Sequence, residues 1–363
     1  MKTIESDYDF SEMHQRMQFY IDQDILSCCA TAVFKGTDLV DHQTFGYMDL
    51  ETRQPLRDDG IYRMASNTKI VTSVALMMLQ EAGLFDLDDP LAKFMPEFSD
   101  MQVLQPNASA AADVSPAENL ISVRHLLSHS AGLSYGFVEP DSVIDQAYLN
   151  NGVNGLGEQE IDLEELCLRI AKLPLAFEPG TSWRYSFATD VCARLVEVLS
   201  GLSFDVFLRQ RLFEPLGMVD TDFWVPEEKA HRLITMYSPQ DLFDPMKPGL
   251  HKAEDMITGP YTAKPTMLSG GGGLVSTVAD YSAFLRMIVN AGEWSGVRLL
   301  KPETLQSMRS NHLADGVQVA FPMWVMPGTV FGLGFAVKNQ LQPNDHATAL
   351  GEYHWGGLAG THS

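Results

Sequence analysis

One apolar run in the first quarter of the chain constrains the fold most. Residues 70–79 read IVTSVALMML, and Gly83 follows after three further residues. A segment that is apolar on all sides belongs in a protein interior, and a glycine just beyond such a segment is typical of a helix end. The run therefore predicts a buried helix that starts near Ser66 and stops at Gly83, with the rest of the chain folded around it.

The outer parts of the chain carry strand patterns. An amphipathic helix is predicted at Phe10–Leu26, where apolar residues recur at helical spacing, and a further helix at about Ala279–Asn290. Strands are predicted at Ser27–Lys35, Leu39–Tyr47, Val317–Val325 and Gly332–Val337.

The middle of the chain has a different texture, because short helical patterns alternate there with long polar loops. The helical patterns lie at Val123–Leu127, Leu163–Ala171 and Asp190–Leu199. A surface loop rich in Ala, Ser and Pro is predicted at Pro106–Pro116, and a flexible loop rich in Gly and Asn at Leu149–Glu158.

This order of elements predicts an α/β fold with two domains. Residues 1–85 and 265–363 would form an antiparallel sheet flanked by helices, and residues 86–264 an inserted, mainly helical domain. Clefts between domains are common ligand sites, so we expect the functional residues where the two segments meet.

Charge excludes some partners. The formal net charge is -22, which repels nucleic-acid phosphates and anionic lipid headgroups. We therefore expect neither nucleic acid nor a membrane as a partner, and a small neutral molecule fits better.

The cysteines and the first residues support two separate expectations. Cys28, Cys29, Cys167 and Cys192 form no Cys-x-x-Cys pair, so we expect small apolar core residues and no metal site. The acidic segment Met1–Ile25 lacks the basic start and apolar core of a secretory signal, and no run approaches the roughly 20 apolar residues that span a bilayer. The expected compartment is the cytoplasm.

A nucleophile is suggested at the start of the buried helix. Ser66 and Lys69 are three residues apart, a spacing that brings side chains to one helix face. A serine hydroxyl needs a group that takes its proton, and an amine in an apolar site can accept or relay one. Ser-x-x-Lys is short and often arises by chance, so the pattern is weak on its own.

A tyrosine offers a third group. The segment Pro179–Ser186 predicts a tight turn that feeds a helix and presents Tyr185, which could meet Ser66 across the cleft. The alternative is a packed aromatic residue whose hydroxyl is satisfied locally, and Tyr185 alone does not decide between the two.

The motifs together are more specific than any one of them. Five segments occur in order along the chain: Ser66–Lys69, His125–Leu133, Pro179–Ser186, Gly271–Tyr281 and His354–Gly357. In this combination the chain resembles the serine β-lactamase and penicillin-binding-protein superfamily, particularly class C β-lactamases and family VIII carboxylesterases. The resemblance runs from about Tyr20 to the C-terminus.

The resemblance implies an acyl-enzyme route that needs no cofactor. Ser66 would attack a carbonyl carbon, and Lys69 and Tyr185 would manage its proton, without the sequence deciding which is the formal base. The backbone N–H groups of Ser66 and of Leu358, on a strand after Trp355, would form the oxyanion hole, with Gly357 as the alternative to Leu358.

Departures from the β-lactamase pattern favour an esterase. Where class C enzymes have Tyr-x-Asn, this chain has Tyr185-Ser186-Phe187, and Trp355-Gly356-Gly357 stands in place of Lys-Thr-Gly, as in family VIII esterases. A hydrogen bond to a charged group contributes roughly 1.5–3 kcal/mol, so losing that lysine weakens binding of anionic antibiotics. We expect Phe187, Trp355, Gly356 and Gly357 to contact a short-chain neutral ester.

Other functions stay open. They are a β-lactamase, a DD-peptidase-like hydrolase supported by His354-Trp355-Gly356, an acyltransferase that uses the same residues, and a non-enzymatic binding homologue. Tyr135 is expected to line the pocket or simply to pack. His125, His129, His354 and His362 are interpreted as structural, and a Ser-His-Asp triad is not expected.

Two further expectations concern glycines and the chain end. Gly270–Gly273 lacks the lysine of a phosphate-binding loop and predicts a close backbone approach instead. Relatives usually continue beyond the third motif, so the sheet domain is expected to be truncated at its C-terminal side and less stable than a longer form.

Overall fold

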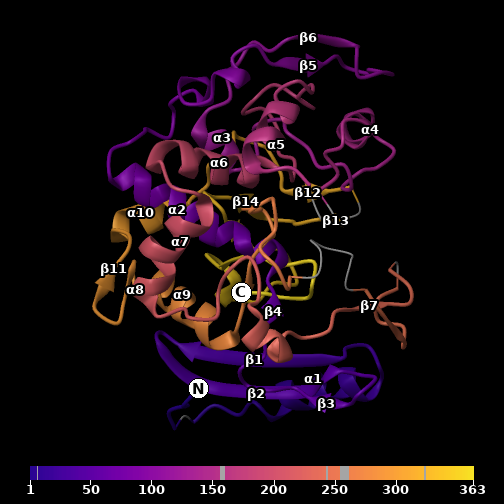
Figure 1. The fold of residues 1–363 in the computed structure, drawn as a ribbon, viewed down its shortest axis with the longest axis vertical. Coiled ribbons are helices and arrows are strands. Elements are labelled where there is room, and N and C mark those ends of the chain that lie inside the picture. The colour runs from indigo at the N-terminus through magenta and orange to yellow at the C-terminus, as the bar shows by residue number, and fades with distance from the viewer. Residues whose placement is uncertain (6, 156–159, 243, 254–260, 323) are drawn as a thin grey trace.

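The computed structural model describes residues 1–5, 7–155, 160–242, 244–253, 261–322 and 324–363. In the view of Figure 1, a layer of strands lies at the bottom, helices fill the middle and a short hairpin lies at the top. The bottom layer is formed by β1 (Cys28–Lys35), β2 (Asp38–Asp49) and β3 (Gln54–Pro55), with α1 (Ser11–Asp22) packed on it.

The remaining helices belong mostly to the middle and upper parts. They are α2 (Thr68–Glu81), α3 (Val123–Leu127), α4 (Val143–Asn150), α5 (Leu163–Ile170), α6 (Ala188–Ser200), α7 (Phe204–Leu208), α8 (Glu214–Leu216), α9 (Val278–Val289) and α10 (Pro302–Met308). The predicted helices at residues 10–26, 66–83, 123–127, 163–171, 190–199 and 279–290 are thus confirmed within a few residues at their ends.

Short strands complete the fold. They are β4 (Tyr62–Arg63), β5 (Gln102–Leu104), β6 (Val114–Pro116), β7 (Tyr237–Pro239), β8 (Leu250–Lys252), β9 (Val275–Ser276), β10 (Glu293–Trp294), β11 (Val297–Arg298), β12 (Ala320–Phe321), β13 (Trp324–Val325), β14 (Thr329–Phe331), β15 (Ala336–Lys338) and β16 (Tyr353–His354). Every pairing between them is antiparallel.

The apolar run at residues 70–79 forms the centre of the molecule. Val71, Val74 and Leu76 of α2 are fully buried, and α2 packs against α6. Helix α6 also contacts α3, α5 and α7, so it links the upper helices to α2. The α2–α6 contact positions the site, because one helix follows Ser66 and the other follows Tyr185.

The predicted α/β class with antiparallel strands flanked by helices is confirmed. In the described residues, however, the strands at the two ends of the chain do not join into one sheet as expected. One sheet has the order β1-β2-β3 and another β14-β15-β16, and the early and late segments meet instead in the pair β4–β9. After β16 the chain folds back on itself. Trp355 exchanges both backbone bonds with Ser363, so this stretch pairs within its own loop.

Two strand predictions near the C-terminus were also wrong in detail. Most of Gly332–Val337 is a turn between β14 and β15, closed by the Gly332 N–H on the Phe335 carbonyl. Gly334 has φ +96° there, and a Cβ would lie 2.3 Å from Ser73 Oγ, so the chain reverses direction where an extended strand was expected. Within Val317–Val325, only β12 and β13 are strands, and residue 323 lies outside the described residues.

The loop predictions hold in part. Most of residues 106–116 is exposed, but its end forms β6 and pairs with β5 in the hairpin at the top of Figure 1. Of the predicted loop Leu149–Glu158, residues 156–158 lie outside the described residues.

One apolar core spans both segments assigned to separate domains. It contains Val71 of α2, Val191 of α6, Phe284 of α9 and Ala336 of β15. The domain boundaries at residues 85 and 265 stay a prediction.

The four cysteines differ in burial. Cys167 and Cys192 are buried as expected, whereas Cys28 and Cys29 on β1 are only partly buried.

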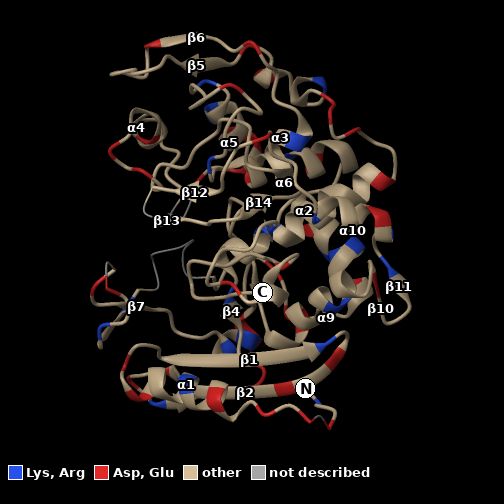
Figure 2. Cartoon of the chain, turned by 180° about the vertical axis from the view of Figure 1, so that it is seen from behind, with Lys and Arg blue, Asp and Glu red and all other residues tan. Residues whose placement is uncertain are grey.

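Asp and Glu residues occur in all parts of the ribbon (Figure 2). Within the described residues, no helix combines the length and apolar character needed to cross a membrane.

Candidate active site

Ser66 lies on a single 3₁₀ turn, η1 (Ala65–Asn67), directly before α2. Ala65 has φ +44°, a left-handed conformation that costs a residue other than glycine about 1–2 kcal/mol. Lys69 Nζ lies 3.4 Å from Ser66 Oγ, so the spacing of three residues brings the two side chains together as predicted. The ammonium group of Lys69 also donates to the Gly271 carbonyl at 2.7 Å.

Tyr185 reaches the same point from the loop before α6. The Gly180 N–H donates to the Ser130 carbonyl and the Arg184 N–H to the His129 carbonyl, so the segment at residues 128–130 braces this loop. The Tyr185 hydroxyl donates to Ser66 Oγ at 2.7 Å. Hence the structure brings Ser66, Lys69 and Tyr185 into one cluster, with Lys69 Nζ 4.4 Å from the Tyr185 ring centre.

Aromatic rings enclose this cluster. The rings of His129 and Trp355 lie 5.1 and 5.4 Å from that of Tyr185, and the Trp355 indole N–H points to the Tyr185 oxygen at 3.4 Å. Burial lowers the pKa of His129 well below its usual value, and the nearby charge of Lys69 acts in the same direction. His129 is therefore a neutral packing residue, in agreement with its structural interpretation.

A buried carboxylate, Asp190, was not singled out from the sequence. Its Oδ1 accepts from Ser269 Oγ at 2.6 Å and from the Gly271 N–H at 3.0 Å, and Tyr135 Oη donates to its Oδ2 at 3.4 Å. Desolvation raises the pKa of Asp190, while the charge of Lys69 opposes that rise. The available signal was an acidic residue on the buried face of a helix that begins just after Tyr185.

The glycine run at residues 270–273 makes the predicted close approach. A Cβ on Gly271 would lie 2.4 Å from Asp190 Oδ2 and 2.8 Å from Tyr135 Oη, so only glycine fits there. Because Gly271 donates to Asp190 and accepts from Lys69, it connects the two charged side chains.

A cavity of about 540 Å³ opens over Ser66. All the predicted substrate-contacting residues line it, namely Tyr135, Phe187, Trp355, Gly356 and Gly357. Further apolar walls come from Phe137, Val138, Met267, Phe321 and Met326, which carried no motif signal. Lys69 is the only Lys or Arg among the described lining residues, so the cavity is suited to a neutral, apolar molecule.

The predicted oxyanion donor Leu358 lies on a turn and not on a strand. β16 ends at His354, and Gly357 donates its N–H to the Thr361 carbonyl at 2.7 Å, so the chain folds back at once. The Gly357 N–H is therefore occupied, whereas Leu358 lines the cavity and its N–H meets no acceptor within the described part of the chain. The Thr361 hydroxyl fastens this loop to the Met64 carbonyl, close to Ser66.

The other histidines fall into two groups. His125 takes part in a helix cap with Ser122, which fits its structural interpretation. His354 and His362 both line the cavity, and burial lowers the pKa of His354. Neither has a hydrogen bond to Ser66 among the described contacts.

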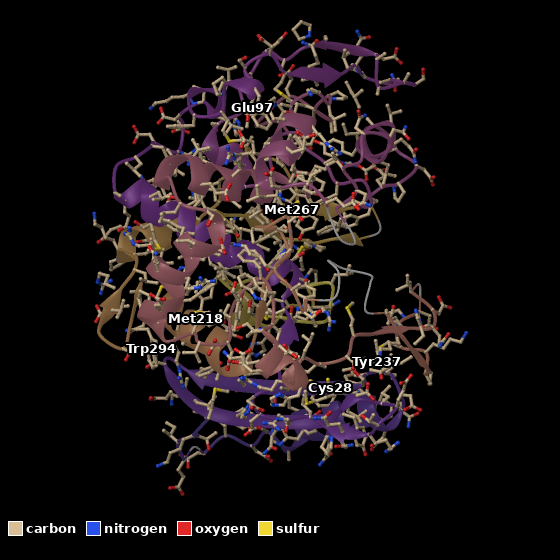
Figure 3. All side chains as sticks on the ribbon, in the orientation of Figure 1. Cys28, Glu97, Met218, Tyr237, Met267 and Trp294 are labelled. Carbon is tan, nitrogen blue, oxygen red and sulfur yellow. The ribbon has the colours of Figure 1, made fainter. Side chains whose placement is uncertain are left out.

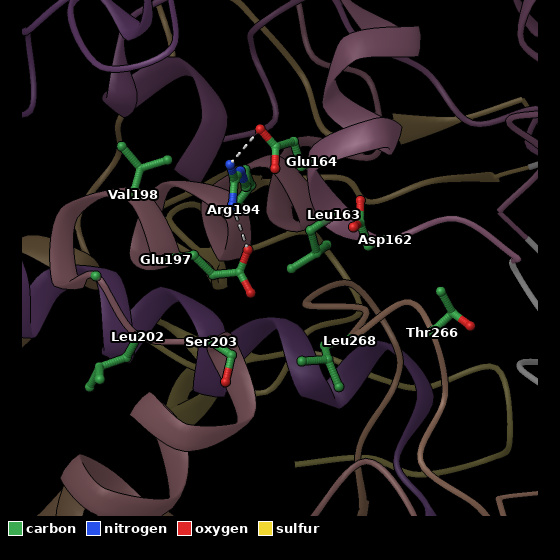
Figure 4. Close-up of a pocket in the computed structure, with 11 residues that line it drawn as sticks. Asp162, Leu163, Glu164, Arg194, Glu197, Val198, Leu202, Ser203, Thr266 and Leu268 are labelled. Atoms are coloured by element: carbon green, nitrogen blue, oxygen red, sulfur yellow. Dashed lines mark hydrogen bonds and ion pairs between the residues drawn. The ribbon is translucent and has the colours of Figure 1, made fainter.

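A second cavity of about 480 Å³ lies beside α5 and α6 (Figure 4). Arg194 points between Glu164 and Glu197 there and pairs with both. Met267 lines the Ser66 cavity and its neighbours Thr266 and Leu268 line the second one, so this segment separates the two. Met267 lies near the centre of the molecule, far from Cys28 in the lower layer (Figure 3).

Comparisons with known proteins agree with the geometry. The profile of the family described as Beta-lactamase matches residues 15–363. An uncharacterized protein of Mycobacterium tuberculosis is 32% identical over 347 residues, which cover 94% of this chain and 82% of that protein. Esterase EstB of Burkholderia gladioli is 29% identical over 326 residues, or 87% of this chain and 76% of that enzyme.

Solved structures share the fold. EstCE1, described as a hydrolase with promiscuous acyltransferase activity, superposes with a TM-score of 0.80 at 24% identity, covering 96% of this chain and 88% of the other.

Proposed function

The chain belongs to the β-lactamase family of serine hydrolases and acyltransferases, and we propose that it cleaves carboxylic esters through an acyl-enzyme formed on Ser66. The observation that carries this proposal is the cluster of Ser66, Lys69 and Tyr185 at the floor of an apolar cavity. The motif at Trp355-Gly356-Gly357 supports a place among family VIII carboxylesterases.

Two proton transfers accompany acylation in this proposal. For this step the Lys69–Tyr185 pair must hold one proton fewer than when both groups are protonated, either as the Lys69 amine or as the Tyr185 phenolate beside the Lys69 cation. Ser66 Oγ bonds to the ester carbonyl carbon while its proton passes to that free base. When the tetrahedral intermediate collapses, the carbon–oxygen bond to the alcohol breaks and the same pair returns the proton to the leaving alcohol. A water molecule then attacks the acyl carbon, and the acid leaves as Ser66 regains its proton.

The developing negative charge needs donors. We assign the oxyanion hole to the backbone N–H groups of Ser66 and Leu358, since the Gly357 N–H is bound to Thr361. The position of Ser66 at the start of α2 adds the favourable end of a helix dipole.

An ester fits this cavity better than an anionic β-lactam. Phe187 is nearly fully buried and stands where an amide would contact a lactam side chain in the class C pattern. Trp355 occupies the position of the lysine that holds the antibiotic's carboxylate. We therefore expect turnover of short-chain p-nitrophenyl esters and weak or no turnover of cephalosporins.

Covalent trapping tests the nucleophile. The protein and Ser66→Ala are each exposed to an organophosphonate and examined by intact mass spectrometry. An adduct on the parent alone supports the proposal, and an adduct of equal yield on Ser66→Ala overturns it. Faster turnover of a cephalosporin than of p-nitrophenyl butyrate would instead favour the β-lactamase alternative.

Acyl transfer is the second candidate function. The structural relative EstCE1 is described as having acyltransferase activity, and an apolar cavity can hold an alcohol next to the acyl group as readily as water. Product analysis with a competing alcohol separates the two, because transfer yields a new ester and hydrolysis yields the acid.

A further inference from the structure

The segment at residues 134–139, here called the wall loop, carries three cavity-lining side chains, Tyr135, Phe137 and Val138. Its two ends are held by one carboxylate. Asp145 on α4 accepts from the Ser134 hydroxyl through Oδ1 and from the Glu139 N–H through Oδ2, the latter at 2.6 Å. The Asp145 side chain is completely buried.

The guanidinium group of Arg184 contacts the same two ends of the wall loop. Arg184 Nε donates to Ser134 Oγ at 2.7 Å, and its Nη1 donates to the Glu139 carboxylate at 3.0 Å. Its Nη2 donates to Asp145 Oδ1 at 2.9 Å. Arg184 thus contacts both ends of the wall loop and the carboxylate that joins them.

Arg184 is also the residue directly before Tyr185. The two ends of the wall loop are therefore linked through Arg184 to the cluster of Ser66, Lys69 and Tyr185. The rings of Tyr135 and Phe187 lie 4.5 Å apart, and the Phe187 N–H donates to the Ser134 carbonyl. In Figures 1 and 2, α4 lies on the same side of the molecule as β12, which carries a further cavity-lining residue, Phe321.

We propose that the Asp145–Arg184 pair is a positioning device for substrate selection, which holds the wall loop closed so that an apolar substituent of the ester packs against Tyr135, Phe137 and Val138. The inference rests on the proposed esterase function. Breaking the pair releases the two ends of the wall loop. Substrates with long apolar groups then lose contacts with the loop that an acetyl or ethyl group never makes. The pair touches neither Ser66 nor Lys69 and acts through the loop.

The test uses two substrate series on the intact protein. In one, p-nitrophenyl esters run from acetate to octanoate, and in the other, acetates carry alcohols of increasing length. For Asp145→Asn and for Arg184→Gln, we expect the ratio of kcat/KM for the longest to the shortest substrate to fall about tenfold in at least one series. Ratios within twofold of the parent's in both series, or higher ratios, overturn the inference.

A merely structural role cannot produce this result. A lower folded fraction reduces kcat for every substrate equally and leaves the ratio unchanged. Asp220→Asn is the matched control, because Asp220 pairs with Arg232 at 2.6 Å and neither residue lines the cavity. We expect its ratios to stay within twofold of the parent's.

Further variants and the activity of the parent protein keep the test decisive. If a single variant does not fold, Arg184→Lys keeps the charge but loses the planar fork, and Asp145→Asn combined with Arg184→Gln keeps the net charge. If the parent protein hydrolyses no ester and forms no adduct at Ser66, the proposed function fails. If the parent hydrolyses esters and the ratios do not move, only the present inference fails.

Discussion

Two buried carboxylates, Asp145 and Asp190, lie near the candidate catalytic cluster, and their environments differ. Asp145 in the upper part faces a guanidinium group at 2.9 Å as well as two neutral donors. Asp190, beside the cluster, has three neutral donors, and Lys69 acts on it from beyond the Gly271 peptide. Both side chains are almost without solvent contact.

This difference in hydrogen-bond partners predicts different roles for the two carboxylates, Asp145 in structure and Asp190 in catalysis. A buried ion pair is costly to break, because the remaining charge is left without a partner. Asp190 is held by neutral donors only, and the charge of Lys69 opposes the rise of the Asp190 pKa that burial causes. We therefore expect changes at Asp145 to appear mainly in stability and selectivity, and changes at Asp190 mainly in the rate.

The largest expected effect is on catalysis. In Asp190→Asn the side-chain oxygen can still accept from Ser269, but the negative charge near Lys69 is lost. The bond from the Gly271 N–H is also weakened, so Gly271, whose carbonyl accepts from Lys69, is held less firmly. Since small misplacements of reacting groups cost about 100-fold in rate, we expect kcat to fall by about that factor with KM within threefold. Steady-state kinetics with p-nitrophenyl butyrate measure it. A kcat near the parent's contradicts the functional assignment of Asp190.

The next effect is on stability. Asp145→Asn leaves the Arg184 guanidinium, whose side chain is 16% exposed, without its buried counter-charge. We expect a loss of about 2 kcal/mol, which corresponds to roughly 3 °C in Tm for a chain of this length, by thermal unfolding. Glu139→Gln removes only the exposed partner of the same guanidinium and should cost about 0.5 kcal/mol or less. Equal losses of stability in both variants would show that the buried ion pair with Asp145 contributes no more than the exposed one with Glu139.

The smallest effect is a pH slope. Burial raises the pKa of Asp190 above the value it has in the unfolded chain, so the folded state holds its proton more tightly. The stability that this proton contributes is fully present below about pH 4 and is lost as the pH rises through the folded-state pKa. Relative to the parent, Asp190→Asn should therefore gain stability as the pH rises from about 4 through the folded-state pKa of Asp190. Denaturant unfolding across that range checks the sign, and a constant difference refutes it.

Local patterns in the sequence predicted much of the fold. The apolar run at residues 70–79 identified α2, and periodicity identified α3, α5, α6 and α9. Short strands were harder, because β12 to β15 are two or three residues long and their pairing depends on distant partners. At residues 332–335 a run that resembles a strand is a turn, since Gly334 packs against Ser73 of α2.

The candidate site divides in the same way. Ser66 and Lys69 are neighbours on one turn, so their proximity follows from helix geometry. Asp190, Met267 and Phe321 carry no local motif, and only packing brings them to the cavity.

By itself, the sequence determined the residues that can do chemistry and the elements that carry them, because nucleophile spacing, turn residues and apolar periodicity act over a few residues. Only the tertiary structure decided that Tyr185 meets Ser66, that Asp190 lies behind Gly271 and that Asp145 closes the wall loop. Each of these contacts joins residues on different elements. Their formation depends on how α2, α4 and α6 pack, which no local pattern specifies.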